Sequence, residues 1–128
     1  SGFETDVVFN FKNNSFLKLG YALLNDDTYV ADITYSRYSL NSLKNNFISN
    51  LSFNYIKNLS QNIIFRYAER SDTTNYTIID SNIIYKPFND QGEIFLNLNN
   101  IFDESYWETN LVPMPGANFI IGYRASFW

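Results

Sequence analysis

The sequence contains no cysteine and no histidine. Without cysteine there is no disulfide and no thiolate metal site, and without histidine the commonest general base and metal ligand are missing. A Ser-His-Asp hydrolase is therefore excluded within these 128 residues. Acidic pairs such as Asp26 and Asp27 fall in polar, loop-like stretches rather than in an apolar setting that would tune them for catalysis. The sequence thus predicts no enzyme, no catalytic residue, no metal site and no cofactor.

Charge and long apolar runs are also scarce. Charged residues make up 17% of the chain and the net charge is -4, so the basic surface that nucleic-acid binding requires is missing. No run approaches the roughly 20 apolar residues of a spanning helix, and no basic start followed by an apolar stretch marks a signal peptide. The one methionine is Met114, and Ser1 lies within an expected strand, which suggests a fragment or a processed piece.

The sequence is rich in aromatic residues, which make up 19% of it as 12 Phe, 10 Tyr and 2 Trp. Together with abundant Ile, Thr and Asn, they favour strands separated by turns. Apolar and polar residues alternate in about seven segments, as expected for strands with two different faces. These segments are 3–12, 15–24, 47–56, 62–69, 76–86, 93–99 and 117–127.

The two expected faces differ in charge. One face is apolar and uncharged until the extreme ends of the strands, whereas the other carries Glu4, Asp6, Lys18, Arg66, Asp80, Glu93 and Arg124. Aromatic residues recur near both ends of the apolar face: Phe11, Tyr55, Tyr85 and Phe127 at one, Tyr21, Phe47, Tyr67 and Phe119 at the other. Transmembrane barrels have these features, with aromatic girdles at the two membrane interfaces.

The connections between these segments alternate in length. Short turns at 13–14, 57–58 and 87–91 alternate with longer connections at 25–45, 70–75 and 103–116. Outer-membrane barrels alternate short periplasmic turns with longer external loops in this way. The sequence therefore predicts an all-β, antiparallel, up-and-down segment of a transmembrane β-barrel with about seven strands. The alternative is a soluble β-sandwich in which the apolar face forms the core.

The last hairpin carries a specific family resemblance. The segments Leu-Asn-Asn-Ile-Phe-Asp-Glu-Ser-Tyr at 98–106 and Pro-Met-Pro-Gly-Ala-Asn-Phe-Ile-Ile-Gly at 113–122 precede an aromatic terminus. This arrangement resembles the C-terminal end of TonB-dependent outer-membrane receptors, with their Asn-Leu-Phe-Asp strand end, Pro-Gly-Arg-x-Phe strand start and final Phe. Ile101 stands in place of Leu, Ala117 in place of Arg, and Trp128 follows Phe127 as an extra residue.

The resemblance implies both a fold and a function. Residues 1–128 would be the C-terminal part of a barrel of about 22 strands, and the plug and the segment that engages TonB would precede Ser1. The intact protein would reside in the bacterial outer membrane and import a ferric siderophore or a similar scarce ligand. Its partners would be outer-membrane lipid, the rest of the barrel, the plug, TonB and the barrel assembly machinery. In this family the terminal strand is the barrel-insertion signal, which implies that role for Tyr123, Phe127 and Trp128; as interfacial anchors they would serve equally well.

Two sets of residues are candidates for ligand contact. On a rigid scaffold, external loops carry recognition, so the first set comprises loop residues that either contact the ligand or pack within the loops and against lipopolysaccharide: Tyr29, Tyr35, Arg37, Tyr38, Tyr106 and Trp107. The second set faces the barrel lumen and either guides an anionic chelate or forms a solvated wall network: Lys18, Arg66, Asp80 and Arg124.

Two other functions compete with this hypothesis. A small self-contained outer-membrane barrel with a structural or adhesive role would need an eighth strand, which the sequence does not offer. A soluble carbohydrate-binding β-sandwich would use exposed aromatic residues for binding and would need no detergent.

Overall fold

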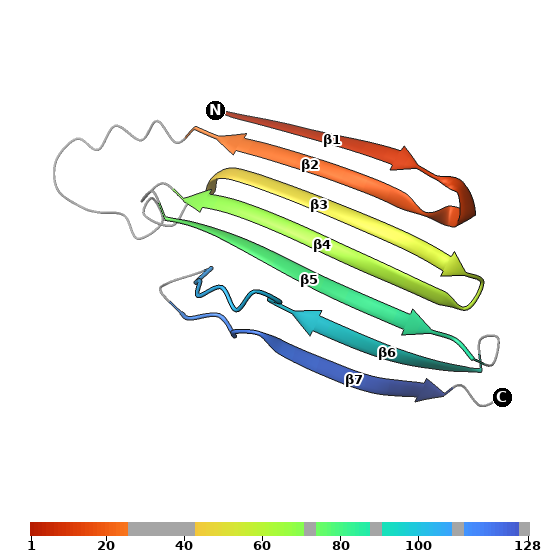
Figure 1. The fold of residues 1–128 in the computed structure, drawn as a ribbon. Helices are drawn as coiled ribbons and strands as arrows, with labels where there is room; N and C mark the ends of the chain where they lie inside the picture. The colour runs from red at the N-terminus through yellow and green to blue at the C-terminus, as the bar shows by residue number, and fades with distance from the viewer. Residues whose placement is uncertain (26–42, 71–73, 88–90, 109–111, 126–128) are drawn as a thin grey trace, which may run out of the picture.

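The computed structural model describes residues 1–25, 43–70, 74–87, 91–108 and 112–125. They form one seven-stranded antiparallel sheet in which every strand pairs with the next along the chain (Figure 1). The strands are β1 (Gly2–Asn10), β2 (Phe16–Leu24), β3 (Leu43–Ile56), β4 (Leu59–Arg70), β5 (Asn75–Tyr85), β6 (Gly92–Asn99) and β7 (Asn118–Ala125). The predicted all-β, up-and-down fold is therefore confirmed. The sheet is open, with β1 and β7 at opposite edges, and it is compatible with a segment of a barrel.

Two of the three predicted short turns lie where the sequence places them, and most of the third, at residues 87–91, lies outside the described residues. Between β1 and β2 the 3-10 turn η1 (Lys12–Asn14) contains two asparagines with positive φ, 61° at Asn13 and 55° at Asn14. Asparagine tolerates this backbone region better than most residues, which suits it to tight hairpins. The Asn54 side-chain amide donates to the carbonyls of both, at 3.0 Å each. The turn at residues 57–58 between β3 and β4 is likewise confirmed.

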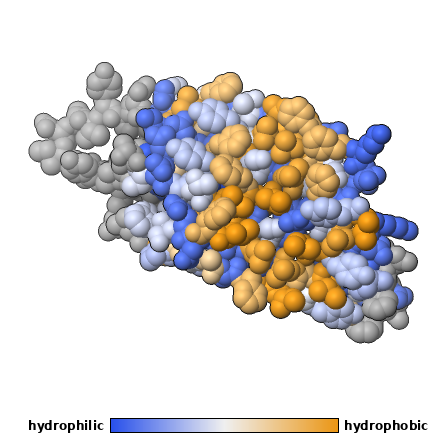
Figure 2. Space-filling view, viewed as in Figure 1, coloured by the Kyte–Doolittle hydropathy of each residue, from blue (hydrophilic) through white to orange (hydrophobic). Residues whose placement is uncertain are grey.

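The register places the predicted apolar positions of all seven strands on one face. One row of paired residues crosses β1 to β5, and a second crosses β5 to β7. The first is Val7, Leu19, Ser49, Phe65 and Ile79, and the second is Ile83, Leu96 and Ile121. Figure 2 shows one face of the molecule, on which hydrophobic residues gather over the middle of the strands and hydrophilic residues lie mainly near the ends. We call the face that carries these rows the apolar face and the opposite one the polar face.

The described residues leave the apolar face uncovered. Buried apolar residues among them are Ala68, Ile78 and Tyr106, whereas Phe119 and Ile121 on the apolar face are 70% and 68% exposed. A β-sandwich would bury such a face beneath a second sheet, but all the described strands belong to one sheet. None of the described residues forms a helix that is long and apolar enough to cross a membrane.

Two strands begin earlier than the sequence predicts. β3 starts at Leu43 rather than at residue 47, and β4 starts at Leu59 rather than at residue 62. Polar residues interrupt the alternation of apolar and polar positions in these extensions, so the pattern does not predict them. Asn45 pairs with Glu69 in the ladder, and its side-chain amide donates to the Glu69 carboxylate at 2.7 Å. Gln61 lies on the apolar face, where it accepts from the Tyr55 hydroxyl at 2.6 Å and donates to Ser81 Oγ at 3.0 Å.

Candidate functional site

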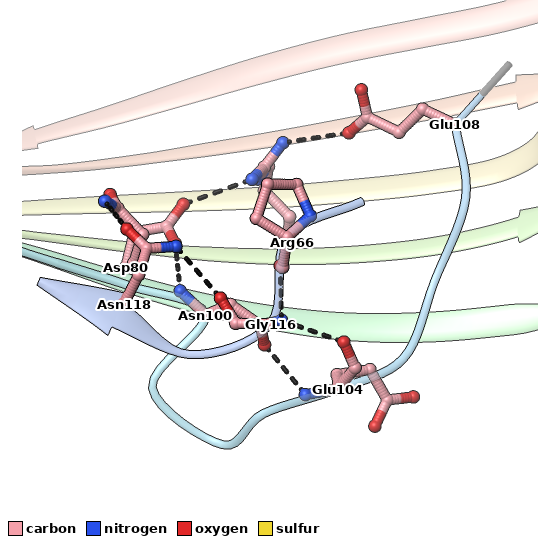
Figure 3. A network of polar contacts seen from close by, with 9 residues as sticks. Arg66, Asp80, Asn100, Glu104, Glu108, Gly116 and Asn118 are labelled. Carbon is pink, nitrogen blue, oxygen red and sulfur yellow. Dashed lines mark hydrogen bonds and ion pairs between the residues drawn. The ribbon is translucent and has the colours of Figure 1, made fainter. Parts of the chain in front are cut away.

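The main polar cluster lies on the polar face, where the connection between β6 and β7 folds back over the sheet (Figure 3). Arg66 on β4 is at its centre. Its Nη2 lies 3.1 Å from Asp80 Oδ2 on β5, and its Nη1 lies 3.4 Å from Glu108 Oε1 in the β6–β7 connection. One guanidinium group therefore joins a carboxylate of the sheet to a carboxylate of the loop.

Asn100, directly after β6, anchors the start of this connection. Its side chain is 3% exposed and its φ is 49°. The amide nitrogen donates to the carbonyls of Glu104, at 2.8 Å, and Pro115, at 3.2 Å, while Oδ1 accepts from the Glu104 amide at 2.9 Å. Its backbone N–H donates to Asp80 Oδ1 at 2.8 Å. Asp80 is thus held between Arg66 and the loop backbone.

Asp103, three residues after Asn100, joins the start of the loop to its far end. Its φ is 56°, and its Oδ1 accepts from the backbone N–H of Ala117 at 2.8 Å, just before β7. Gly116 lies so close to this carboxylate that a Cβ there would overlap Asp103 Oδ1. The Asn-x-x-Asp and Pro-Gly elements of the final hairpin therefore act together, because the Asp103 carboxylate needs the space that Gly116 leaves.

Tyr106 packs inside the loop. It is 8% exposed and its ring centroid lies 4.7 Å from that of Tyr76 on β5. Burial raises the pKa of the Tyr106 phenol above its ordinary value of 10.0; the positive charge of Arg66 and its hydrogen bond to the phenol oppose this rise, and Glu108 and Asp80 add to it. The backbone of Tyr106 accepts from the Met114 N–H at 2.8 Å. Tyr106 therefore packs against Tyr76 within the loop, and its predicted contact with a ligand stays a prediction.

The other candidates for ligand contact or barrel insertion differ in their surroundings. Trp107 forms a bridge with Pro113 and is 40% exposed. Tyr123 lies on the apolar face of β7 and is 60% exposed. The remaining candidates for ligand contact or barrel insertion lie outside the described residues: Tyr29, Tyr35, Arg37, Tyr38, Phe127 and Trp128.

The predicted lumen-facing charged residues all lie on the polar face, and each forms an ion pair. Arg66 pairs with Asp80, as described above. At one side of the sheet Lys18 Nζ lies 3.2 Å from Asp6 Oδ2, and at the other Arg124 Nη1 lies 2.6 Å from Glu93 Oε1. Apolar residues such as Val8 and Ile120 share this face, so it is mixed rather than wholly polar.

Two residues of the cluster were missed from the sequence. Asn100 had a signal, because it sits in the final hairpin motif directly after a strand, where a positive φ suits asparagine. Glu108 had none, because its partner Arg66 is 42 residues away. Their contacts hold the β6–β7 connection against the sheet. The part of the chain that the structure describes contains no group of three or more side chains able to hold a metal ion.

No protein-family model, curated protein or solved structure matches this chain.

Proposed function

We propose that this chain forms part of the wall of a transmembrane β-barrel in the bacterial outer membrane. The observation that supports this most directly is the apolar face, which runs through seven strands in register and is exposed to its surroundings. In water so large an apolar surface is unfavourable and marks a contact site. In hydrocarbon it is the preferred surface of a barrel strand, whose other face is polar.

The height of the apolar face supports a membrane environment. On β4 the apolar residues of this face, Ile63, Phe65 and Tyr67, are flanked by the polar residues Gln61 and Glu69. At about 3.4 Å per residue and a strand tilt of about 40°, these two flanking residues lie roughly 20 Å apart along the membrane normal, which is of the order of the apolar band of about 25 Å in outer-membrane barrels.

Tyrosine hydroxyls lie beside both ends of this band. The Tyr55 hydroxyl donates to Gln61 at 2.6 Å, and the Tyr21 hydroxyl donates to Asn45, the partner of Glu69, at 2.8 Å. Tyrosine is enriched at membrane interfaces because its ring is apolar and its hydroxyl forms hydrogen bonds with water and other polar groups. The two pairs are therefore in keeping with a bilayer that ends near them.

We further propose that the complete protein is a TonB-dependent receptor that imports a ferric siderophore or a similar scarce ligand. The resemblance of the final hairpin supports this function. The sheet edges support a barrel larger than this chain: β1 and β7 do not pair with each other, and unpaired strand edges are costly in hydrocarbon. They argue against a small barrel closed by these strands alone.

Cell fractionation and iron uptake test the proposal. The protein should appear in the outer-membrane fraction and should require detergent for extraction. Iron uptake should be measured with radioactive iron in three chelate classes: catecholate, hydroxamate and carboxylate. Iron-starved cells that lack the protein should take up less iron from at least one of these classes than cells that contain it. Recovery of the protein as a monomer soluble without detergent would refute the membrane wall. Unchanged uptake of all three classes, from cells with and without the protein, would refute iron import.

A further inference from the structure

The two carboxylates that contact Arg66 are held differently. The Asp80 carboxylate is fixed, because its second oxygen accepts from the Asn100 backbone at 2.8 Å while the first contacts Arg66. The Glu108 carboxylate contacts Arg66 through Oε1 alone, at 3.4 Å, and its side chain is 37% exposed. Of the two, Glu108 is therefore the one that a competing anion can replace.

We propose that Arg66 is a binding residue for a ligand carboxylate on the polar face, and that Glu108 is an internal substitute for that carboxylate. Displacement of Glu108 would release one attachment of the β6–β7 connection from the sheet. This inference rests on the proposed function in one respect, since it takes the polar face as the side on which ligand arrives.

The chemistry of Arg66 fits this role. A guanidinium group presents a planar fork of donors that matches a carboxylate and stays charged at any physiological pH. Asp80 holds Nη2 and fixes the orientation of the fork, so a ligand carboxylate takes the place of Glu108 on Nη1. A partly exposed ion pair contributes little stability, so a ligand carboxylate with a second contact of its own can displace Glu108.

Trp107 gives a direct readout of this exchange. It precedes Glu108, is 40% exposed and bridges to Pro113, so its surroundings change when Glu108 leaves Arg66. Residues 1–128 contain 2 tryptophans. The test therefore uses a full-length variant in which Trp128 and any tryptophan outside these residues are replaced with phenylalanine, so that all tryptophan fluorescence comes from Trp107. We would titrate this full-length variant in detergent micelles with succinate at constant ionic strength, using the neutral isostere succinamide as the control.

Succinate should shift the Trp107 emission saturably, and succinamide should not. The variant Glu108→Gln should shift the ligand-free emission towards the succinate-bound position and raise the apparent affinity for succinate by about two- to fivefold, as expected from removal of a weak competing ion pair. Arg66→Lys keeps the charge and loses the fork, so it should lower the affinity by about tenfold. The control Lys57→Gln removes an exposed positive charge at the turn between β3 and β4, outside this loop, and it should leave the titration unchanged.

Absence of a saturable succinate response would overturn the inference, and so would an affinity that Arg66→Lys leaves unchanged. An equal response to succinamide would overturn it as well, because the site would then not recognise charge. The titration needs no membrane and no transport, so its failure is separate from failure of the proposed function. A protein that binds succinate at Arg66 but is soluble without detergent would refute the barrel wall alone.

Discussion

Replacing Asn100 with alanine should destabilise the final hairpin strongly. The asparagine side chain is 3% exposed and takes part in three hydrogen bonds to loop backbone, at 2.8, 3.2 and 2.9 Å. At about 0.5–1.5 kcal/mol each, these bonds contribute about 1.5–4.5 kcal/mol. Alanine at a φ of 49° adds about 1 kcal/mol of backbone strain. The expected loss in the free energy of unfolding is about 3–5 kcal/mol, measured by denaturant titration of the full chain in micelles.

Two matched variants separate the contributions. Asn100→Gly removes the same hydrogen bonds but accepts a positive φ, so it should cost about 1 kcal/mol less than alanine. Asn99→Ala, one residue earlier, loses one exposed hydrogen bond to Asn118, of 2.9 Å, and should cost about 1 kcal/mol or less. If Asn100→Ala costs no more than Asn99→Ala, the role assigned to Asn100 as the anchor of the loop is wrong.

Three other predictions follow from the sheet and its loop. Gly122→Ala would place a Cβ within the Phe95 ring and should cost about 1–3 kcal/mol of unfolding free energy, most of it recovered by adding Phe95→Leu; an unchanged denaturation midpoint would contradict this packing. A spectrophotometric titration of the unchanged protein and of Tyr106→Phe should differ by one phenol, and the pKa of that phenol should lie above 10.0. Because burial favours its neutral form, its contribution to stability should be complete below that pH and decline as pH rises through the raised pKa, whereas titration at or below 10.0 would contradict the burial. Lysine at Ile63 should cost about 2–4 kcal/mol in a bilayer and lysine at Ile64, on the polar face beside Asp80, less than about 1 kcal/mol; equal costs would disprove the division into two faces.

The regular part of the fold was predictable because strand alternation depends on neighbouring residues. The apolar positions from Val7 to Ile121 fall on one face as expected, since period-two patterning and register determine each other. The early starts at Leu43 and Leu59 were missed because polar residues interrupt the apolar–polar alternation there. Some of these residues, such as Asn45, form hydrogen bonds with side chains of the neighbouring strand.

The candidate site was less predictable because it is built from distant contacts. The sequence placed Arg66 and Asp80 on the charged face, and both lie there. Nothing in the sequence pairs Arg66 with Glu108, because that contact depends on how the β6–β7 connection folds back across two strands. The same fold buries Tyr106 against Tyr76, although aromatic residues in an expected external loop also fit a ligand-contact role.

In the proposed barrel wall, one face of the sheet meets lipid and the other meets water. Residues 1–128 contain no cysteine, so single spin-labelled cysteines can be introduced into them once any cysteine elsewhere in the full protein has been replaced. Adjacent isoleucines lie on opposite faces at 63 and 64, 83 and 84, and 120 and 121, which makes each pair its own control. For the full protein in bilayers, we predict that labels at 63, 83 and 121 collide preferentially with oxygen and labels at 64, 84 and 120 with a water-soluble nickel chelate. Equal accessibility within the pairs, or preferential access of the nickel chelate to 63, 83 and 121, would show that the apolar face does not meet lipid.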